Sequence, residues 1–135
     1  MVFLRAFALE NNSIVVIGGG HAGIEAALAI SKKGLSCTLI SLNKNSIGRL
    51  SCNPAIGGLA KGHLVKEIDA LGGVMGKIAD KTTIQNKILN QSKGRAVWSP
   101  RSQVDKIKYT KYVQTLISNN KNISVVEDEI LNLII

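Results

Sequence analysis

The first regular pattern of apolar positions is a strand, a glycine-rich turn and a helix. Four apolar residues at 14–17 predict a buried strand, and the Ala-rich stretch that ends at Gly34 predicts a helix. Between them lie Gly18, Gly20 and Gly23, with the spacing of a dinucleotide-binding fingerprint. In that fingerprint the first glycine makes the turn, the second admits a diphosphate to the backbone, and the third lets helix and strand pack closely. A glycine-rich turn without a ligand is the alternative.

The second apolar run, residues 36–42, predicts the next strand of a Rossmann-like, doubly wound α/β sheet. The fingerprint usually places an acidic residue at the end of this strand, where it binds the adenosine ribose. Ser41 stands there instead, and its hydroxyl can accept a hydrogen bond from a ribose hydroxyl. The pattern therefore predicts an adenine dinucleotide, and it does not by itself separate FAD from NAD.

The pattern downstream alternates between helices and strands. Ser99 as N-cap and Pro100 at the first helical position predict the start of a helix that ends near residue 118. Ile84 and Ile88 are expected to face inward from an extended segment. The predicted elements are a loop at 43–58, a helix at 59–71, the extended segment at 82–89, the helix from 99, and strands at 123–126 and 130–135.

Length and charge limit the interpretation. A chain of 135 residues suffices for one domain, whereas a dinucleotide-dependent enzyme also needs a substrate domain. Residues 1–135 are therefore interpreted as the N-terminal portion of a longer enzyme. Residues 32–111 hold 15 basic and four acidic residues, a balance of +11, while the whole chain carries +8. This basic middle suits a polyanionic partner or a lysine-rich solvated surface, and both remain open.

The two cysteines exclude a disulfide framework, and their spacing does not suit a zinc site. The longest near-apolar stretch, residues 14–30, contains His21, Glu25 and four glycines, so we expect no membrane span. A cytoplasmic protein is the resulting expectation.

The loop at 51–58 holds the candidate chemistry. Cys52 is a candidate nucleophile or redox thiol, with a purely positional role as the alternative. The amides of Gly57 and Gly58 could reach a phosphate or a cofactor ring, unless they only form a turn into a helix. A second candidate surface combines basic residues with the only tryptophan and suits phosphates and an unstacked base: Lys93, Arg95, Trp98 and Arg101. A core tryptophan beside a solvated basic loop is its alternative.

Four blocks together resemble the glucose-inhibited division protein A family. They are Ile-Gly-Gly-Gly-His-Ala-Gly at 17–23, Ser-Cys-Asn-Pro-Ala-Ile-Gly-Gly at 51–58, the stretch 60–73, and Ala-Val-Trp-Ser-Pro-Arg at 96–101. The resemblance covers nearly all of the chain from residue 14 and about the first fifth of a family member. Members of this family are FAD-dependent tRNA uridine 5-carboxymethylaminomethyl modification enzymes.

The resemblance implies a reaction and a set of partners. The reaction adds a carboxymethylaminomethyl or aminomethyl group to C5 of the wobble uridine of certain tRNAs. Its carbon comes from methylenetetrahydrofolate, its amine from glycine or ammonium, and its reducing equivalents from NADH. A GTPase subunit acts with the enzyme, and the full-length protein is expected to be a homodimer. The basic middle then becomes a tRNA-facing surface.

The resemblance also implies site residues. FAD would bind Gly18, Gly19, Gly20, His21, Ala22 and Gly23, with the loop that contains Asn53, Gly57 and Gly58 beside the flavin. The backbone of Ile130 would meet the adenine. His21 taken alone is more often a hydrogen-bonded structural residue.

Two positions depart from the family pattern: Arg95 stands where Pro is expected, and Asn86 where an aromatic residue is expected. A drifted or degraded copy of such an enzyme is therefore an open alternative. Two rival functions are a folate-dependent flavoprotein tRNA uracil methyltransferase and a nucleotide- or RNA-binding module without catalysis.

Overall fold

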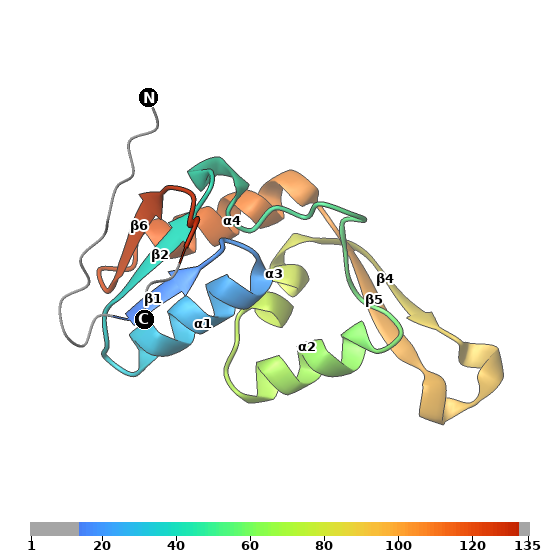
Figure 1. Cartoon of the computed structure of the whole chain (residues 1–135). Coiled ribbons are helices and arrows are strands. Elements are labelled where there is room, and N and C mark those ends of the chain that lie inside the picture. The colour runs from blue at the N-terminus through green and yellow to red at the C-terminus, as the bar shows by residue number, and fades with distance from the viewer. Residues whose placement is uncertain (1–13, 133–135) are drawn as a thin grey trace.

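The computed structural model describes residues 14–132, which form two three-stranded sheets and their helices. Figure 1 shows the first sheet between α1 (His21–Lys32) and α4 (Lys106–Ser118). Helix α3 (Met75–Thr82) contacts both α4 and the second sheet, and it joins the two halves. Helix α2 (Lys61–Ala70) lies beside the second sheet.

The first sheet is parallel and has the order β1-β2-β6. Its strands are β1 (Ile14–Ile17), β2 (Cys37–Ser41) and β6 (Ile123–Glu127). The central strand β2 is the most buried, with Leu39 fully inaccessible, because helices cover both of its faces. This order places the three strands as in one half of a Rossmann-like sheet, and it confirms the predicted α/β class.

The helices that cover this sheet turn one apolar face toward it. In α1 the buried residues are Ile24, Ala27 and Leu28, at the spacing of one helix face. In α4 the buried face consists of residues four positions apart: Tyr109, Val113 and Ile117. These residues form one continuous core with Leu39.

The second sheet is antiparallel and has the order β3-β5-β4. Its strands are β3 (Ala55–Gly57), β4 (Thr83–Leu89) and β5 (Ser99–Val104). Beyond β3, the paired strands β4 and β5 project from the body as a hairpin (Figure 1). The tip of this hairpin carries two 3-10 helices, η2 (Gln91–Lys93) and η3 (Arg95–Val97).

The helix predicted to begin at Ser99 is wrong, because residues 99–104 form the central strand β5. Pro100 is compatible with this strand because β3 pairs only with residues 101–103, so the missing N–H lies beyond the three-stranded part. The helix begins instead at Lys106. The side chain of Asp105 accepts hydrogen bonds from the amides of Ile107 and Lys108, each at 3.0 Å.

Two further expectations about the second sheet are wrong. Ile84 and Ile88, expected to face inward, are 70% and 43% exposed, because the edge strand β4 has no layer packed over it. The end of the predicted loop at 43–58 forms β3, and its beginning forms a 3-10 helix, η1 (Lys44–Ser46).

Helix α3 was not predicted, although its buried residues follow helical spacing: Met75, Ile78, Ala79 and Thr82. Its N-terminal cap comes from α1, where the Glu25 carboxylate accepts from the amides of Val74 and Met75 at 2.9 and 2.7 Å. A cap from 50 positions away leaves no local signal.

The strand predicted at 130–135 is also wrong where it can be checked. Residues 130–132 have no regular structure, and residues 133–135 lie outside the described part of the chain.

Candidate functional site

The carboxyl ends of the three parallel strands surround a cavity of about 540 Å³. This is the edge at which ligands bind in open α/β sheets. Its walls come from the turn after β1, the end of β2 with the loop that follows, and the segment after β6. The lining residues are Ile17, Gly18, Gly19, Gly20, Ile40, Ser41, Leu42, Ser46, Arg49, Ser51, Asp128, Glu129 and Ile130.

The glycine-rich turn shapes this cavity. Gly18 has a φ of +102°, a conformation that favours glycine, and its amide donates to the Ile40 carbonyl at 2.8 Å. A Cβ on Gly23 would lie 1.9 Å from the Gly18 carbonyl oxygen, so only glycine lets the helix approach the turn this closely. These are the turn and packing roles that the fingerprint predicts for the two residues.

Gly20 is different, because it borders open space. It caps α1 with extended backbone, and its carbonyl accepts from the Ile24 amide at 3.0 Å. Apart from Gly20 and its neighbours in the chain, no atom of residues 14–132 lies within 4 Å of the position that a Cβ on Gly20 would take. No side chain of residues 14–132 caps the first turn of α1, which also carries no acidic residue. The helix therefore presents its N-terminal amides, with their positive dipole end, to an anion in this space.

Gly19 is buried and packs against the protein. A Cβ there would lie 2.8 Å from the Ile47 side chain and 2.9 Å from the Ser41 hydroxyl oxygen. Its carbonyl also accepts from the Gly48 amide at 3.0 Å. Gly19 thus holds the loop after β2 against the turn, and its backbone reaches the cavity wall.

The end of β2 combines a hydroxyl with neighbouring carboxylates. Ser41 is buried, and its hydroxyl donates to the Asn43 carbonyl at 3.3 Å, which leaves the hydroxyl lone pairs to accept. Its own carbonyl accepts from the Asp128 amide at 3.1 Å, so β6 brings Asp128 and Glu129 to the cavity. Sequence reasoning missed these two carboxylates. Their position directly after the predicted strand at 123–126 was the available signal.

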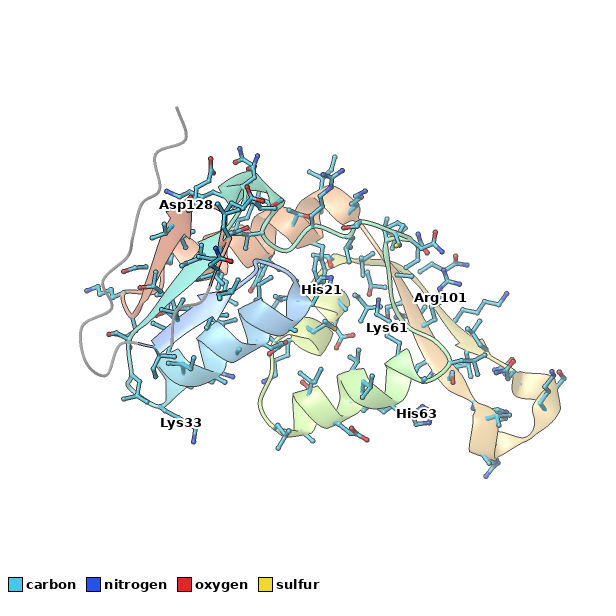
Figure 2. All side chains as sticks on the ribbon, viewed as in Figure 1. His21, Lys33, Lys61, His63, Arg101 and Asp128 are labelled. Carbon is cyan, nitrogen blue, oxygen red and sulfur yellow. The ribbon has the colours of Figure 1, made fainter. Side chains whose placement is uncertain are left out.

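His21 lies at the start of α1 but does not line the cavity. Its ring packs edge-to-face on Tyr109, with centroids 5.7 Å apart. Burial lowers the pKa of His21, the Lys61 ammonium lowers it further, and the Glu25 carboxylate opposes both. Figure 2 shows His21 at the end of α1 that faces Lys61 on α2. The contact of the neutral imidazole with Tyr109 thus holds the start of α1 against α4. Ala22 beside it is exposed and also lies outside the cavity lining.

The loop at 51–58 is divided between the cavity and the second sheet. Ser51 lines the cavity, and Cys52 and Asn53 after it are exposed. Gly57 is the last residue of β3 in the second sheet, and Gly58 follows it. A Cβ on Gly57 would lie 2.3 Å from the Pro100 carbonyl oxygen, and that oxygen accepts from the Gly58 amide at 2.9 Å. The Gly58 amide is therefore engaged within the protein.

Three further possibilities concern the part of the chain that the structure describes: a metal site, a disulfide and a membrane-spanning helix. Residues 14–132 contain no cluster of three or more His, Cys, Asp or Glu side chains that could hold a metal ion. Cys37 is buried near the Ala27 carbonyl and is not paired with Cys52. Within the same residues, each helix is too short or too polar to cross a bilayer.

Comparison with solved structures agrees with this geometry. The chain superimposes on the structure of Aquifex aeolicus GidA with a TM-score of 0.85 and 53% sequence identity, over 91% of this chain and 20% of that one. At this identity and score, the agreement extends beyond the general fold to the detailed path of the chain.

Sequence relatives point the same way. The tRNA uridine 5-carboxymethylaminomethyl modification enzyme MnmG of Aquifex aeolicus is 51% identical over 130 residues, which is 96% of this chain and 21% of that protein. The enzyme of the same name from a Sulfurihydrogenibium species is 54% identical over 122 residues, 90% of this chain and 20% of that protein. The chain thus spans about a fifth of the length of these relatives. The family described as Glucose inhibited division protein A matches residues 13–135, and the chain belongs to that family.

Proposed function

We propose that this chain forms the FAD-binding part of a tRNA-modifying enzyme that acts on C5 of the wobble uridine. The observation that carries this proposal is the open cavity at the N-terminus of α1, in a chain more than half identical to enzymes named for tRNA uridine modification. The product is a carboxymethylaminomethyl or aminomethyl uridine.

The cavity fits the adenosine diphosphate half of FAD in three ways. The uncapped N-terminus of α1 and the free space at Gly20 suit a diphosphate, which needs N–H donors and close backbone approach. The Ser41 hydroxyl and the Asp128 and Glu129 carboxylates supply acceptors for ribose hydroxyls. Ile130 adds a half-buried wall that suits an adenine ring.

The residues of this chain hold and orient the cofactor. Bound flavin would supply the oxidation–reduction chemistry on the folate-derived carbon. Arg49 brings the only cationic side chain to the described cavity lining, where it can offset the nearby carboxylates and a ligand phosphate. Ser51 lines the cavity, and Cys52 follows it in the chain. The exposed thiol of Cys52 remains the candidate nucleophile or redox group.

The finer points of the reaction are supported by family resemblance. We infer that methylenetetrahydrofolate supplies the carbon, glycine or ammonium the amine, and NADH the reducing equivalents. A GTPase subunit is the proposed partner, and the complete enzyme is a proposed homodimer. We also propose a cytoplasmic location for the enzyme.

Two analyses of the intact protein test the proposal. Heat release of the bound cofactor, followed by spectroscopy and mass analysis, is expected to yield FAD. Incubation with unmodified tRNA, methylenetetrahydrofolate, glycine, NADH and the GTPase subunit is expected to add carboxymethylaminomethyl to the wobble uridine. A bare methyl group would indicate the rival uracil methyltransferase. A protein that retains FAD but leaves every tRNA uridine unchanged would contradict the assigned reaction.

A further inference from the structure

The hairpin formed by β4 and β5, residues 83–104, is named the arm here and is largely exposed along β4 and at its tip. It projects from the body in Figure 1, and its outer end lies away from the parallel sheet. Residues 84–88 of β4 and residues 91–98 at the tip are all exposed. A two-stranded ribbon is only marginally stable by itself. The shape of so exposed an arm therefore needs an explanation other than its own stability.

The arm carries charge of one sign. Residues 83–104 contain four basic residues and no Asp or Glu: Lys87, Lys93, Arg95 and Arg101. Within residues 14–132 the only ion pair joins Lys108 to Asp105, which lies just outside the arm. The strand register places Lys87 directly opposite Arg101, on the same face of the ribbon (Figure 2 labels Arg101). Like charges in this arrangement repel each other, and an anion bound between them would replace this repulsion with attraction of both side chains to the anion.

The tip holds an aromatic ring in a fixed orientation. The Trp98 indole N–H donates to the Gln91 carbonyl at 3.2 Å, and the Arg95 guanidinium lies 5.8 Å from the ring centroid. Asn90 closes the tip by donating to the Val97 carbonyl at 3.3 Å. Trp98 is nevertheless 37% exposed. A planar ring with an adjacent guanidinium, held in place yet open to solvent, is a platform for stacking.

These features together fit an unpaired segment of RNA. Aromatic rings and Arg planes stack on bases that are free of a helix, while Lys and Arg side chains neutralise the phosphates between them. An A-form duplex suits the arm less well, because its bases are stacked inside and its major groove is too narrow for side chains to read.

We propose that the arm binds a single-stranded RNA loop, with Trp98 stacked on a base and the Lys87–Arg101 pair holding a backbone phosphate. This inference rests on the proposed function only in that the anticodon loop of the tRNA substrate would supply the loop.

The test measures the affinity of the intact, flavin-loaded protein for a synthetic anticodon stem-loop that carries uridine at the wobble position. Trp98→Ala is expected to weaken binding roughly tenfold, because it removes one stacking interaction, and Trp98→Phe is expected to restore most of the affinity. Lys87→Ala and Arg101→Ala should each reduce the slope of log affinity against log salt by about 0.7–1. The control Lys121→Ala removes an exposed charge next to β6 and should change neither quantity.

The competitor is a blunt RNA duplex of the same composition. Weaker binding of the duplex than of the stem-loop by the wild type, with that preference lost in Trp98→Ala, is the expected result. If wild type and Trp98→Ala bind the stem-loop equally while FAD is retained and uridine is modified, the arm inference is wrong and the proposed function stands. If the arm variants instead lose only thermal stability or a protein partner, the arm is a packing surface, and the inference is again overturned.

Discussion

The two sheets of this protein differ in the groups that they present to a ligand. In the parallel sheet, Gly18, Gly19 and Gly20 bring the backbone to the cavity wall, where it stands beside a few polar side chains and above a core of buried apolar residues. In the antiparallel sheet, β4 and the tip of the arm expose their side chains, and the distinguishing groups are cations and one indole. The first region is suited to a ligand of fixed shape, the second to an extended polyanion. Substitutions of buried residues should therefore affect folding in the first region, whereas substitutions of exposed residues should affect surface binding in the second.

The largest contrast is expected between two apolar residues, one from each sheet. Leu39→Ala removes a fully buried side chain from β2 and should lower the free energy of unfolding by about 4 kcal/mol. Ile84→Ala removes a side chain that is 70% exposed on β4 and should change it by less than about 0.5 kcal/mol. Urea unfolding of the two variants measures both values. Equal losses would mean that β4 is covered in solution.

Gly23 tests the close approach of α1 to the turn. Gly23→Ala places a Cβ 1.9 Å from the Gly18 carbonyl oxygen and should cost about 3 kcal/mol of unfolding free energy, because the helix must shift. Gly76→Ala on α3 is the matched control, since its Cβ would lie 3.6 Å from the Val65 side chain, in ordinary contact. Denaturant unfolding should show no loss for the control. A stable Gly23→Ala protein would show that the turn is looser than described.

Glu25 tests the connection between the halves, since its carboxylate caps α3. Glu25→Ala leaves the Val74 and Met75 amides without their acceptor and should destabilise the protein by about 2 kcal/mol. Glu67→Ala on the exposed surface of α2 provides the control. Hydrogen exchange of residues 74–76 is expected to accelerate in Glu25→Ala only. Unchanged exchange there would mean that α3 does not depend on this cap.

The smallest expected effect is a pH dependence at His21. Its pKa is lowered below 6.5 in the folded state, chiefly by burial. The unfolded chain then binds more protons as the pH falls below 6.5, so this residue's contribution to stability is complete above 6.5 and decreases toward the lowered pKa. His21→Phe should remove this part of the slope of unfolding free energy against pH, while His63→Phe should retain it. An identical slope in wild type and His21→Phe would contradict the assignment.

The parallel sheet could be predicted from the sequence because its signals are local. The strand at 14–17, the spacing of Gly18, Gly20 and Gly23, and the run at 36–42 each specify their own structure within a few residues. The family blocks likewise lie within short segments, and the family match confirms them.

The second sheet could not be predicted in the same way, because its structure depends on distant partners. The Ser99–Pro100 pair resembles a helix start, but pairing with β3 and β4 makes it a strand, and Asp105 caps the helix instead. Helix α3 depends on Glu25 from α1. At the cavity, Asp128 and Glu129 supply the carboxylates that the end of β2 lacks. Predicting this from the sequence required knowing that β6 lies beside β2.

Gly20→Ala shows whether a cofactor diphosphate lies against the backbone at Gly20. The new Cβ meets no atom of residues 14–132 beyond its chain neighbours within 4 Å, and the backbone φ of −75° suits alanine. The free energy of unfolding should therefore be unchanged or slightly higher. The same methyl group would occupy the expected diphosphate position, so the affinity for FAD should fall at least about tenfold. A Gly20→Ala protein that folds normally and retains FAD with wild-type affinity would contradict the claim.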